Sequence, residues 1–181
     1  MFKRIQGFTL IELMVTVAVL AIVLSIAVPS FQTLITNNKS QTMGDEFAQA
    51  LNFARSEAVK NKKRVSICAS SNGTSCTGSW SEGFIVFQDN AASDTAAAIS
   101  LGPILKVWPK LSAAGTFSVM RNTTPAATSI SFIRYTSLGT LAPIGNATIV
   151  ASLKLTGCTG KAARKISVNL SGFVNVQSDD C

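Results

Sequence analysis

The residue types that most often carry enzyme chemistry are absent or scattered in this sequence. Histidine does not occur in the 181 residues, so neither a Ser-His-Asp nor a Cys-His arrangement can form. The nine acidic residues are dispersed, and the pair Asp179-Asp180 is better explained as a solvated segment than as a general acid and base. We therefore expect no enzyme, no catalytic residue and no cofactor.

Glu12 is the acid in an unusual position. It lies in 8–28, FTLIELMVTVAVLAIVLSIAV, which holds no other charge. As a helix rising about 1.5 Å per residue, this stretch is long enough to cross a bilayer core of roughly 30 Å. A carboxylate there costs a few kcal/mol unless it is paired, and the stretch supplies no cation. A cut between Gly7 and Phe8 would create an α-amino group near Glu12; the alternative is a tolerated polar residue at the membrane edge.

The segment before the apolar stretch is short and basic. Residues 1–7, MFKRIQG, carry Lys3 and Arg4, and the positive-inside tendency keeps such an N-terminus cytoplasmic. The rest of the chain then lies across the membrane. An ordinary secretory signal places a small-residue cleavage site after its apolar run, whereas Gly7 precedes it here. We therefore expect the span to be retained.

The four cysteines are Cys68, Cys76, Cys158 and Cys181, and their spacings match no usual zinc pattern, so we expect no metal site. In an exported domain, cysteines are expected to form disulfides. Four cysteines allow three connectivities, and the sequence does not decide between them rigorously. We favour Cys68 with Cys76, which closes a short loop, and Cys158 with Cys181, which ties the final residue to the fold.

A helical pattern continues beyond the apolar stretch. Pro29 lacks an amide donor, so we expect the helix to kink there and to continue. Apolar residues that include Phe47, Leu51 and Ala54 then recur at helical spacing among polar ones. The sequence thus predicts an amphipathic continuation over 29–60 and a bent helix on the order of 80 Å long.

From Arg64 the apolar residues recur at every second position, which is typical of strands. Strands are expected at 65–69, 83–88, 104–108, 116–120, 129–135, 148–155, 165–170 and 173–177, within a head over 61–181. The last two strands predict a hairpin whose Ile166, Val168, Val174 and Val176 share the buried face. Residues 90–100 are expected to be a flexible loop.

A helix followed by strands predicts an α+β fold, in which an antiparallel sheet packs its apolar face on Phe47, Leu51 and Ala54. The long kinked helix carries this head on its C-terminal half.

The N-terminal motif is Gly7-Phe8-Thr9-Leu10-Ile11-Glu12-Leu13, after a basic leader and before an apolar helix. It resembles the class III leader of type IV pilins and type II secretion pseudopilins. The resemblance implies that a prepilin peptidase removes residues 1–7, cutting after Gly7 and methylating the amine of Phe8. It also implies that Glu12 sets the register of assembly by pairing with the Phe8 amine of a neighbouring subunit.

Within that class the chain is similar to the GspH/FimT group, which includes FimU. The likeness rests on 51–58, LNFARSEA, on 80–87, WSEGFIVF, and on 164–168, RKISV, with Gly172 and Val174. It implies a minor pilin in the tip or initiation complex of a type IV pilus, which serves adhesion, twitching motility and DNA uptake. A GspH-like pseudopilin of a type II secretion system is the alternative.

The resemblance also implies partners and a location. The expected partners are other minor pilins and the major pilin, which bind through the N-terminal helix, and the inner-membrane assembly platform. The subunit is expected in the inner membrane with its head in the periplasm, and then at the pilus tip on the cell surface.

Two basic groups stand out in the head. Some members of the GspH/FimT group bind DNA through a glycine- and arginine-rich stretch where this chain has Lys161, Arg164 and Lys165, so a DNA-capture pilin is a third hypothesis. This stretch has one arginine and no aromatic residue for stacking, so we favour a solvated turn.

The second group, in 60–64, either docks an acidic face of another pilin or simply stabilises the helix end; we favour the latter.

Overall fold

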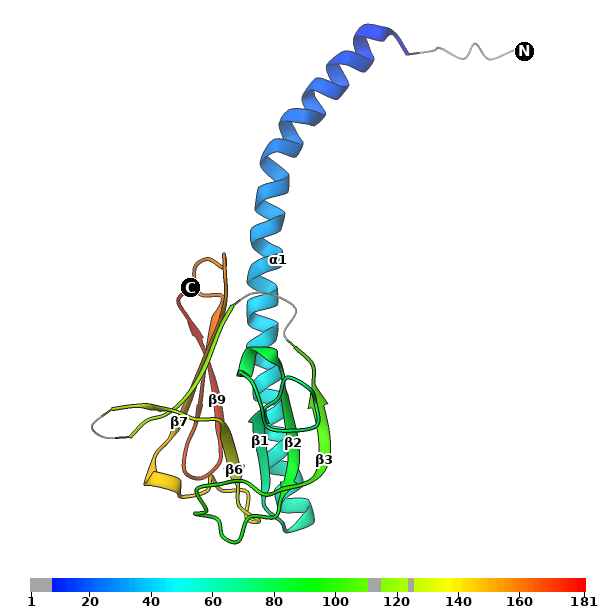
Figure 1. Ribbon diagram of the computed structural model, residues 1–181. Coiled ribbons are helices and arrows are strands. Elements are labelled where there is room, and N and C mark those ends of the chain that lie inside the picture. Colours follow the sequence, from blue (N-terminus) through cyan, green and yellow to red (C-terminus); the bar gives the residue numbers. More distant parts are fainter. Residues whose placement is uncertain (1–7, 111–114, 124–125) are drawn as a thin grey trace. The chain divides into compact units, whose positions relative to one another are not determined.

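The computed structural model describes residues 8–110, 115–123 and 126–181, which form two compact units (Figure 1). The first unit comprises the described residues up to Ile35, and the second, the head, is Thr36–Cys181. Helix α1, Leu10–Asn61, contributes to both units. The head therefore contains the second half of α1 as well as every strand.

Helix α1 has a defined start and end. At its start, the Thr9 hydroxyl accepts a hydrogen bond from the Glu12 amide at 3.3 Å, as an N-cap side chain does. The helix continues through Pro29, as predicted, whereas the kink expected there stays a prediction. At its end, Lys62 takes a left-handed backbone conformation with φ 52°, and the Lys63 amide bonds back to the Ala58 carbonyl at 3.3 Å. Such a closed end stops the helix and turns the chain towards the first strand.

The first unit exposes its apolar side chains. The large ones from Phe8 to Ile35 all face solvent, with exposed fractions of 48% or more. No residue of the most apolar window of α1 is buried, and the helix is long and apolar enough to cross a membrane. Because this unit has no apolar layer of its own to cover these side chains, they need a lipid or protein environment.

The strands form two antiparallel sheets. The first has the order β3-β2-β1-β6, and the second has the order β5-β4-β7-β8-β9. The bounds are β1 Val65–Ala69, β2 Phe84–Asp89, β3 Leu101–Trp108, β4 Gly115–Arg121, β5 Thr128–Ser129, β6 Phe132–Tyr135, β7 Ile149–Leu155, β8 Ala163–Val168 and β9 Val174–Asp179. Two short 3-10 helices, Trp80–Glu82 and Ile144–Asn146, lie in the connections.

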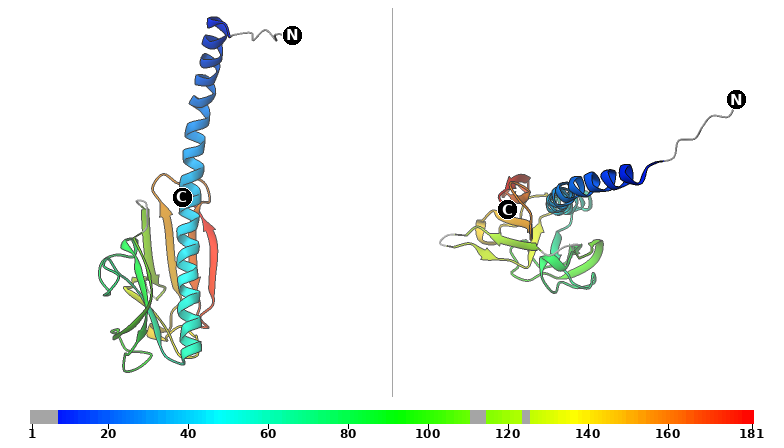
Figure 2. Two further views of the ribbon diagram at one scale, coloured as in Figure 1. Left: turned by 90° about the vertical axis from the view of Figure 1, so that its right-hand side faces the viewer. Right: turned by 90° about the horizontal axis from the view of Figure 1, so that it is seen from above.

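The core of the head forms where both sheets meet α1, and Figure 2 shows the cyan segment of the helix running along their strands. Phe47 is central and fully buried. Its ring makes edge contacts with Phe84 of β2 at 5.3 Å and with Phe117 of β4 at 4.8 Å between centroids. A single helical side chain thus contacts both sheets, and the predicted α+β fold packed on Phe47, Leu51 and Ala54 is confirmed.

The structure differs from expectation where the chain changes sheets. The strand predicted over 129–135 is two strands, because β5 pairs with β4 of the second sheet and β6 pairs with β1 of the first. Ile130 and Ser131 connect them, the first donating its amide to Val119 at 3.1 Å and the second accepting from Ala69 at 3.4 Å. Apolar alternation continues across this step, so the sequence pattern alone did not reveal it.

The C-terminal hairpin is confirmed, with Ile166 opposite Val176 and Val168 opposite Val174. Ile166 and Val168 are buried, whereas Val176 is 39% exposed. Val174 is half-buried against the core. The expectation that all four side chains share the buried face is therefore wrong for Val176, because β9 is the edge strand of its sheet and has a neighbour on one side only.

Candidate functional site

The N-terminal residues singled out by the sequence lie at the start of α1. Gly7 and the rest of 1–7 lie outside the described residues. Phe8 is 84% exposed, and Glu12 is exposed in the first helical turn. No ion pair of Glu12 occurs among the described residues, and its pairing with the Phe8 amine of a neighbouring subunit stays a prediction.

Both favoured disulfides are present. Cys68 of β1 bonds to Cys76 with 5.6 Å between Cα atoms, and Cys158 bonds to Cys181 with 5.7 Å. The first closes a small loop beside the sheet. The second is supported by the Cys181 amide, which donates to the Gly160 carbonyl at 2.9 Å. The C-terminal segment is thereby held against the loop that follows β7.

That loop is fastened to α1 by a reciprocal pair of hydrogen bonds. The Thr159 amide donates to the Asn37 side-chain oxygen at 2.9 Å, and the Asn37 side-chain nitrogen lies 3.2 Å from the Thr159 hydroxyl. One helical turn on, the buried Ser40 hydroxyl accepts the Leu155 amide at 3.3 Å. The C-terminal disulfide is therefore coupled through this loop to the first helical turns of the head.

The three candidate DNA-binding residues do not form one surface. Lys161 is exposed in the loop before β8. Arg164 faces α1, where its Nε lies 3.6 Å from an oxygen of Asp45 and its side chain is only 16% exposed. Lys165 is the next residue of the strand, so its side chain points to the opposite face. The alternation of the strand thus separates residues that are neighbours in sequence.

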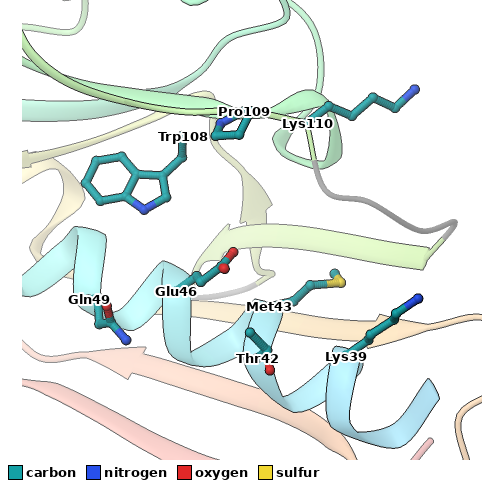
Figure 3. Close-up of a pocket in the computed structure, with 8 residues that line it drawn as sticks. All are labelled: Lys39, Thr42, Met43, Glu46, Gln49, Trp108, Pro109 and Lys110. Atoms are coloured by element: carbon teal, nitrogen blue, oxygen red, sulfur yellow. The ribbon is translucent and has the colours of Figure 1, made fainter. Parts of the chain in front are cut away.

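A groove lies between α1 and the segment that follows β3, and Figure 3 shows the side chains around it. Its volume is about 450 Å³, and it is lined by Lys39, Thr42, Met43, Glu46, Gln49, Trp108, Pro109 and Lys110. Met43 and Trp108 supply apolar surface, whereas the lysines and Glu46 supply charges of both signs. The sequence did not predict this groove, because its two walls come from segments that are far apart in the chain. The one hint in the sequence was Trp108, an aromatic residue directly before Pro109.

The groove combines apolar, amine and carboxylate groups but pairs no nucleophile with a base. In the part of the chain that the structure describes, no three His, Cys, Asp or Glu side chains come together where a metal ion could be held. The described residues thus combine a helix whose N-terminal half exposes large apolar side chains with a disulfide-bonded head.

A long N-terminal helix with an exposed apolar half, packed at its other half against an antiparallel disulfide-bonded head, is the type IV pilin fold. The family described as "Type II transport protein GspH" matches residues 44–172, and the "Prokaryotic N-terminal methylation motif" matches residues 2–28. The chain therefore belongs to the GspH family of type IV minor pilins and pseudopilins, which confirms the resemblance seen in its sequence.

Individual relatives agree with this assignment. The Type IV narrow pilus major component PilA5 of Thermus thermophilus is 35% identical over 99 residues, which cover 51% of this chain and 84% of that protein. The type IV minor pilin FimU of Pseudomonas aeruginosa PAO1 has a similar fold in two crystal forms. The TM-scores are 0.55 and 0.52 at 21% identity, covering 77% and 76% of this chain and 89% and 91% of FimU.

Proposed function

We propose that this chain is a minor pilin of the tip or initiation complex of a type IV pilus. The observation that carries the proposal is the apolar half of α1, whose large side chains are all exposed and which precedes a head with its own core. Such a helix requires lipid while the subunit is stored and other helices once it is assembled. The head needs no such cover and is free to present its surface.

The proposed assembly sequence begins in the inner membrane. A prepilin peptidase cuts after Gly7 and methylates the Phe8 amine, while the head faces the periplasm. The assembly platform then extracts the subunit, and the apolar segment exchanges lipid for the helices of other minor pilins and the major pilin. Glu12 fixes the register by pairing with the Phe8 amine of a neighbour, because a desolvated carboxylate without a cation is strongly disfavoured.

The relatives favour a pilus over a secretion system, since PilA5 and FimU are both described as type IV pilus proteins. The pseudopilin alternative is supported by the description of the family as a type II transport protein. A DNA-capture role in transformation is less well supported, because Arg164 is already paired with Asp45 and points away from Lys165. Adhesion, twitching motility and DNA uptake would follow from the pilus that the subunit helps to build.

Deletion of the gene, with piliation, type II secretion and transformation scored side by side, separates these functions. The proposed minor pilin predicts loss of piliation with normal secretion. Complementation with Glu12→Ala should leave the head folded but fail to restore filaments. Asp180→Ala, which removes an exposed acid of the head outside the groove, is the matched control and should restore them. Full piliation with Glu12→Ala, or a secretion defect alone, would contradict the proposal.

A further inference from the structure

Large apolar side chains gather on the head at the end of α1. Leu138 is 80% exposed, Phe173 60%, Val59 50% and Leu170 45%. Single exposed apolar residues are ordinary, but several that share one surface mark an interaction site. These four residues define the apolar patch.

Arg55 holds the parts of the apolar patch together. Its Nε donates to the Gly139 carbonyl at 2.9 Å, next to Leu138 in the chain, and its guanidinium lies 4.3 Å from the ring centre of Phe173. The Leu170 carbonyl accepts the Leu141 amide at 3.1 Å, which joins the two turns directly. Val59 is one helical turn after Arg55. The patch is therefore preformed on two turns and a helix, and little ordering is required to bind a partner.

A basic rim adjoins the patch. It consists of Lys60, Lys62, Lys63 and Arg64, and three of these residues line a hollow of about 350 Å³ together with Asp89, Asn90 and Ser137. Lys60 follows Val59 in the helix, and Ser137 precedes Leu138 in the turn, so rim and patch are continuous. The Asp89 carboxylate in this hollow is neutralised by buried Arg134. Lys60 is paired with Glu57 and Arg64 with Asp94, so the rim charge that no acid of the described residues offsets comes from Lys62 and Lys63.

We propose that the apolar patch and its basic rim dock the head of a different pilin of the same filament. The contact surface of that partner would carry apolar side chains flanked by Asp or Glu, which complement the patch and the rim respectively. This inference rests on the proposed function and adds the surface through which the head meets its neighbour.

Other occupants fit the surface less well. DNA would neutralise the lysines but would leave four large apolar side chains in water. A second copy of this chain is a poor complement, because its net charge stays positive even after Lys3 and Arg4 leave with residues 1–7. Its acids Glu57, Asp89 and Asp94 are also already paired with basic groups of their own head. A lipid surface needs no shaped hollow with the neutral donors Asn90 and Ser137 beside the charges.

The test is site-specific photocrosslinking of the full-length chain in piliated cells. A photoreactive residue replaces Leu138 on the patch or, as control, Val107, which is 46% exposed on the edge strand β3. Purified filaments should contain a cross-link from position 138 to another pilin subunit, at several times the yield from position 107. The double variant Lys62→Glu with Lys63→Glu should lower that yield about tenfold. The charge-matched control, Lys106→Glu with Lys154→Glu, reverses two exposed lysines elsewhere on the head and should leave the yield unchanged.

The outcomes separate this inference from the proposed function. Filaments that contain the chain but show no cross-link from position 138, or a cross-link only to itself, to DNA or to lipid, overturn the docking surface alone. A cross-link yield from position 138 that is unchanged in the Lys62→Glu, Lys63→Glu variant also overturns the docking surface, since the basic rim would then contribute nothing to binding. Absence of the chain from purified filaments overturns the proposed function and this inference together.

Discussion

Arg134 and Asp89 form an ion pair in the interior of the head, with 2.7 Å between Nε and a carboxylate oxygen and neither side chain exposed. The remaining nitrogens of Arg134 donate to the carbonyls of Asp94, Ala96 and Ala98. The second oxygen of Asp89 accepts the amides of Ala91 and Ser100. One buried pair thereby holds the loop over 90–100, which contains neither helix nor strand.

Removing either member of this pair should destabilise the head strongly. Arg134→Met leaves the Asp89 carboxylate buried without its cation, and we expect a loss of about 3–5 kcal/mol in the free energy of unfolding. Urea unfolding of the fragment Thr36–Cys181 measures it. Asp94→Asn is the control, because it breaks a partly exposed ion pair in which the side chain of Arg64 is 29% exposed and that of Asp94 is 43% exposed. This substitution should lower the free energy of unfolding by less than about 1 kcal/mol. Equal losses in the two variants would contradict the buried-pair interpretation.

Acid should remove part of the stability through the same carboxylate. Burial by itself raises the pKa of Asp89, but hydrogen bonds to its charged form outweigh this effect and leave the pKa below its ordinary value of 3.8. The donors are the Ser100 and Ala91 amides, the Ser66 hydroxyl and Arg134. The pKa of Asp89 is lower in the folded state than in the unfolded state. The carboxylate therefore contributes its full stabilisation above the unfolded-state pKa, and this stabilisation is lost as the pH falls through the folded-state pKa.

The measurement is the urea midpoint of the head from about pH 6 down to about pH 2. The urea midpoint of the wild-type head should fall at the acid end of this range. The Asp89→Asn head should have a lower midpoint at about pH 6, but its midpoint should fall less as the pH is lowered. A parallel fall in both proteins would show that other groups control the acid sensitivity.

Gly44→Ala should destabilise the head, although alanine is the better helix former by about 1 kcal/mol. Gly44 is buried, and a Cβ there would collide with the Cβ and Cγ of Arg164. Helix and strand β8 would have to separate, for a net loss of about 1–3 kcal/mol. Thermal unfolding of the head measures it. Asn52→Ala, at an exposed position of the same helix, should be neutral or stabilising, and a similar gain at Gly44 would refute the steric argument.

Tyr135→Phe should leave the stability unchanged or raise it by up to about 1 kcal/mol. The Tyr135 hydroxyl is buried and has no hydrogen-bond partner within the described residues, and burial raises its pKa, so it stays neutral. Trp80→Phe is the contrasting variant, because the indole nitrogen donates to the Ile130 carbonyl at 3.0 Å. Urea denaturation should give Trp80→Phe a clearly lower free energy of unfolding than Tyr135→Phe. The reverse order would mean that the tyrosine hydroxyl has a hydrogen-bond partner after all.

The sequence predicted the features that depend on neighbours along the chain. Helix α1 follows from its apolar run and helical periodicity, and the C-terminal hairpin from alternation on both sides of Gly172. The N-terminal motif was by itself sufficient to indicate the pilin class. These inferences succeed because each concerns residues only a few positions apart.

The features that the sequence did not predict depend on distant partners. From the sequence alone, Arg134 looks like an exposed charge of its strand, because its ion-pair partner Asp89 is 45 positions away in the chain. Arg164 looked like a companion of Lys165, yet it faces Gly44 and Asp45 on the helix. The groove of Figure 3 and the apolar patch likewise combine turns, strand ends and helix faces that only the packed head brings together.

The bonds of Asn37 and Ser40 to the loop after β7 have a practical consequence for truncation. The region matched by the GspH family begins at residue 44, which looks like a natural place to start a soluble fragment. A protein cut there would lose both side chains, leave the buried Leu155 amide without its acceptor and release the loop that carries Cys158. Crystallisation and biophysical work should therefore begin no later than Thr36, eight residues ahead of the homology boundary.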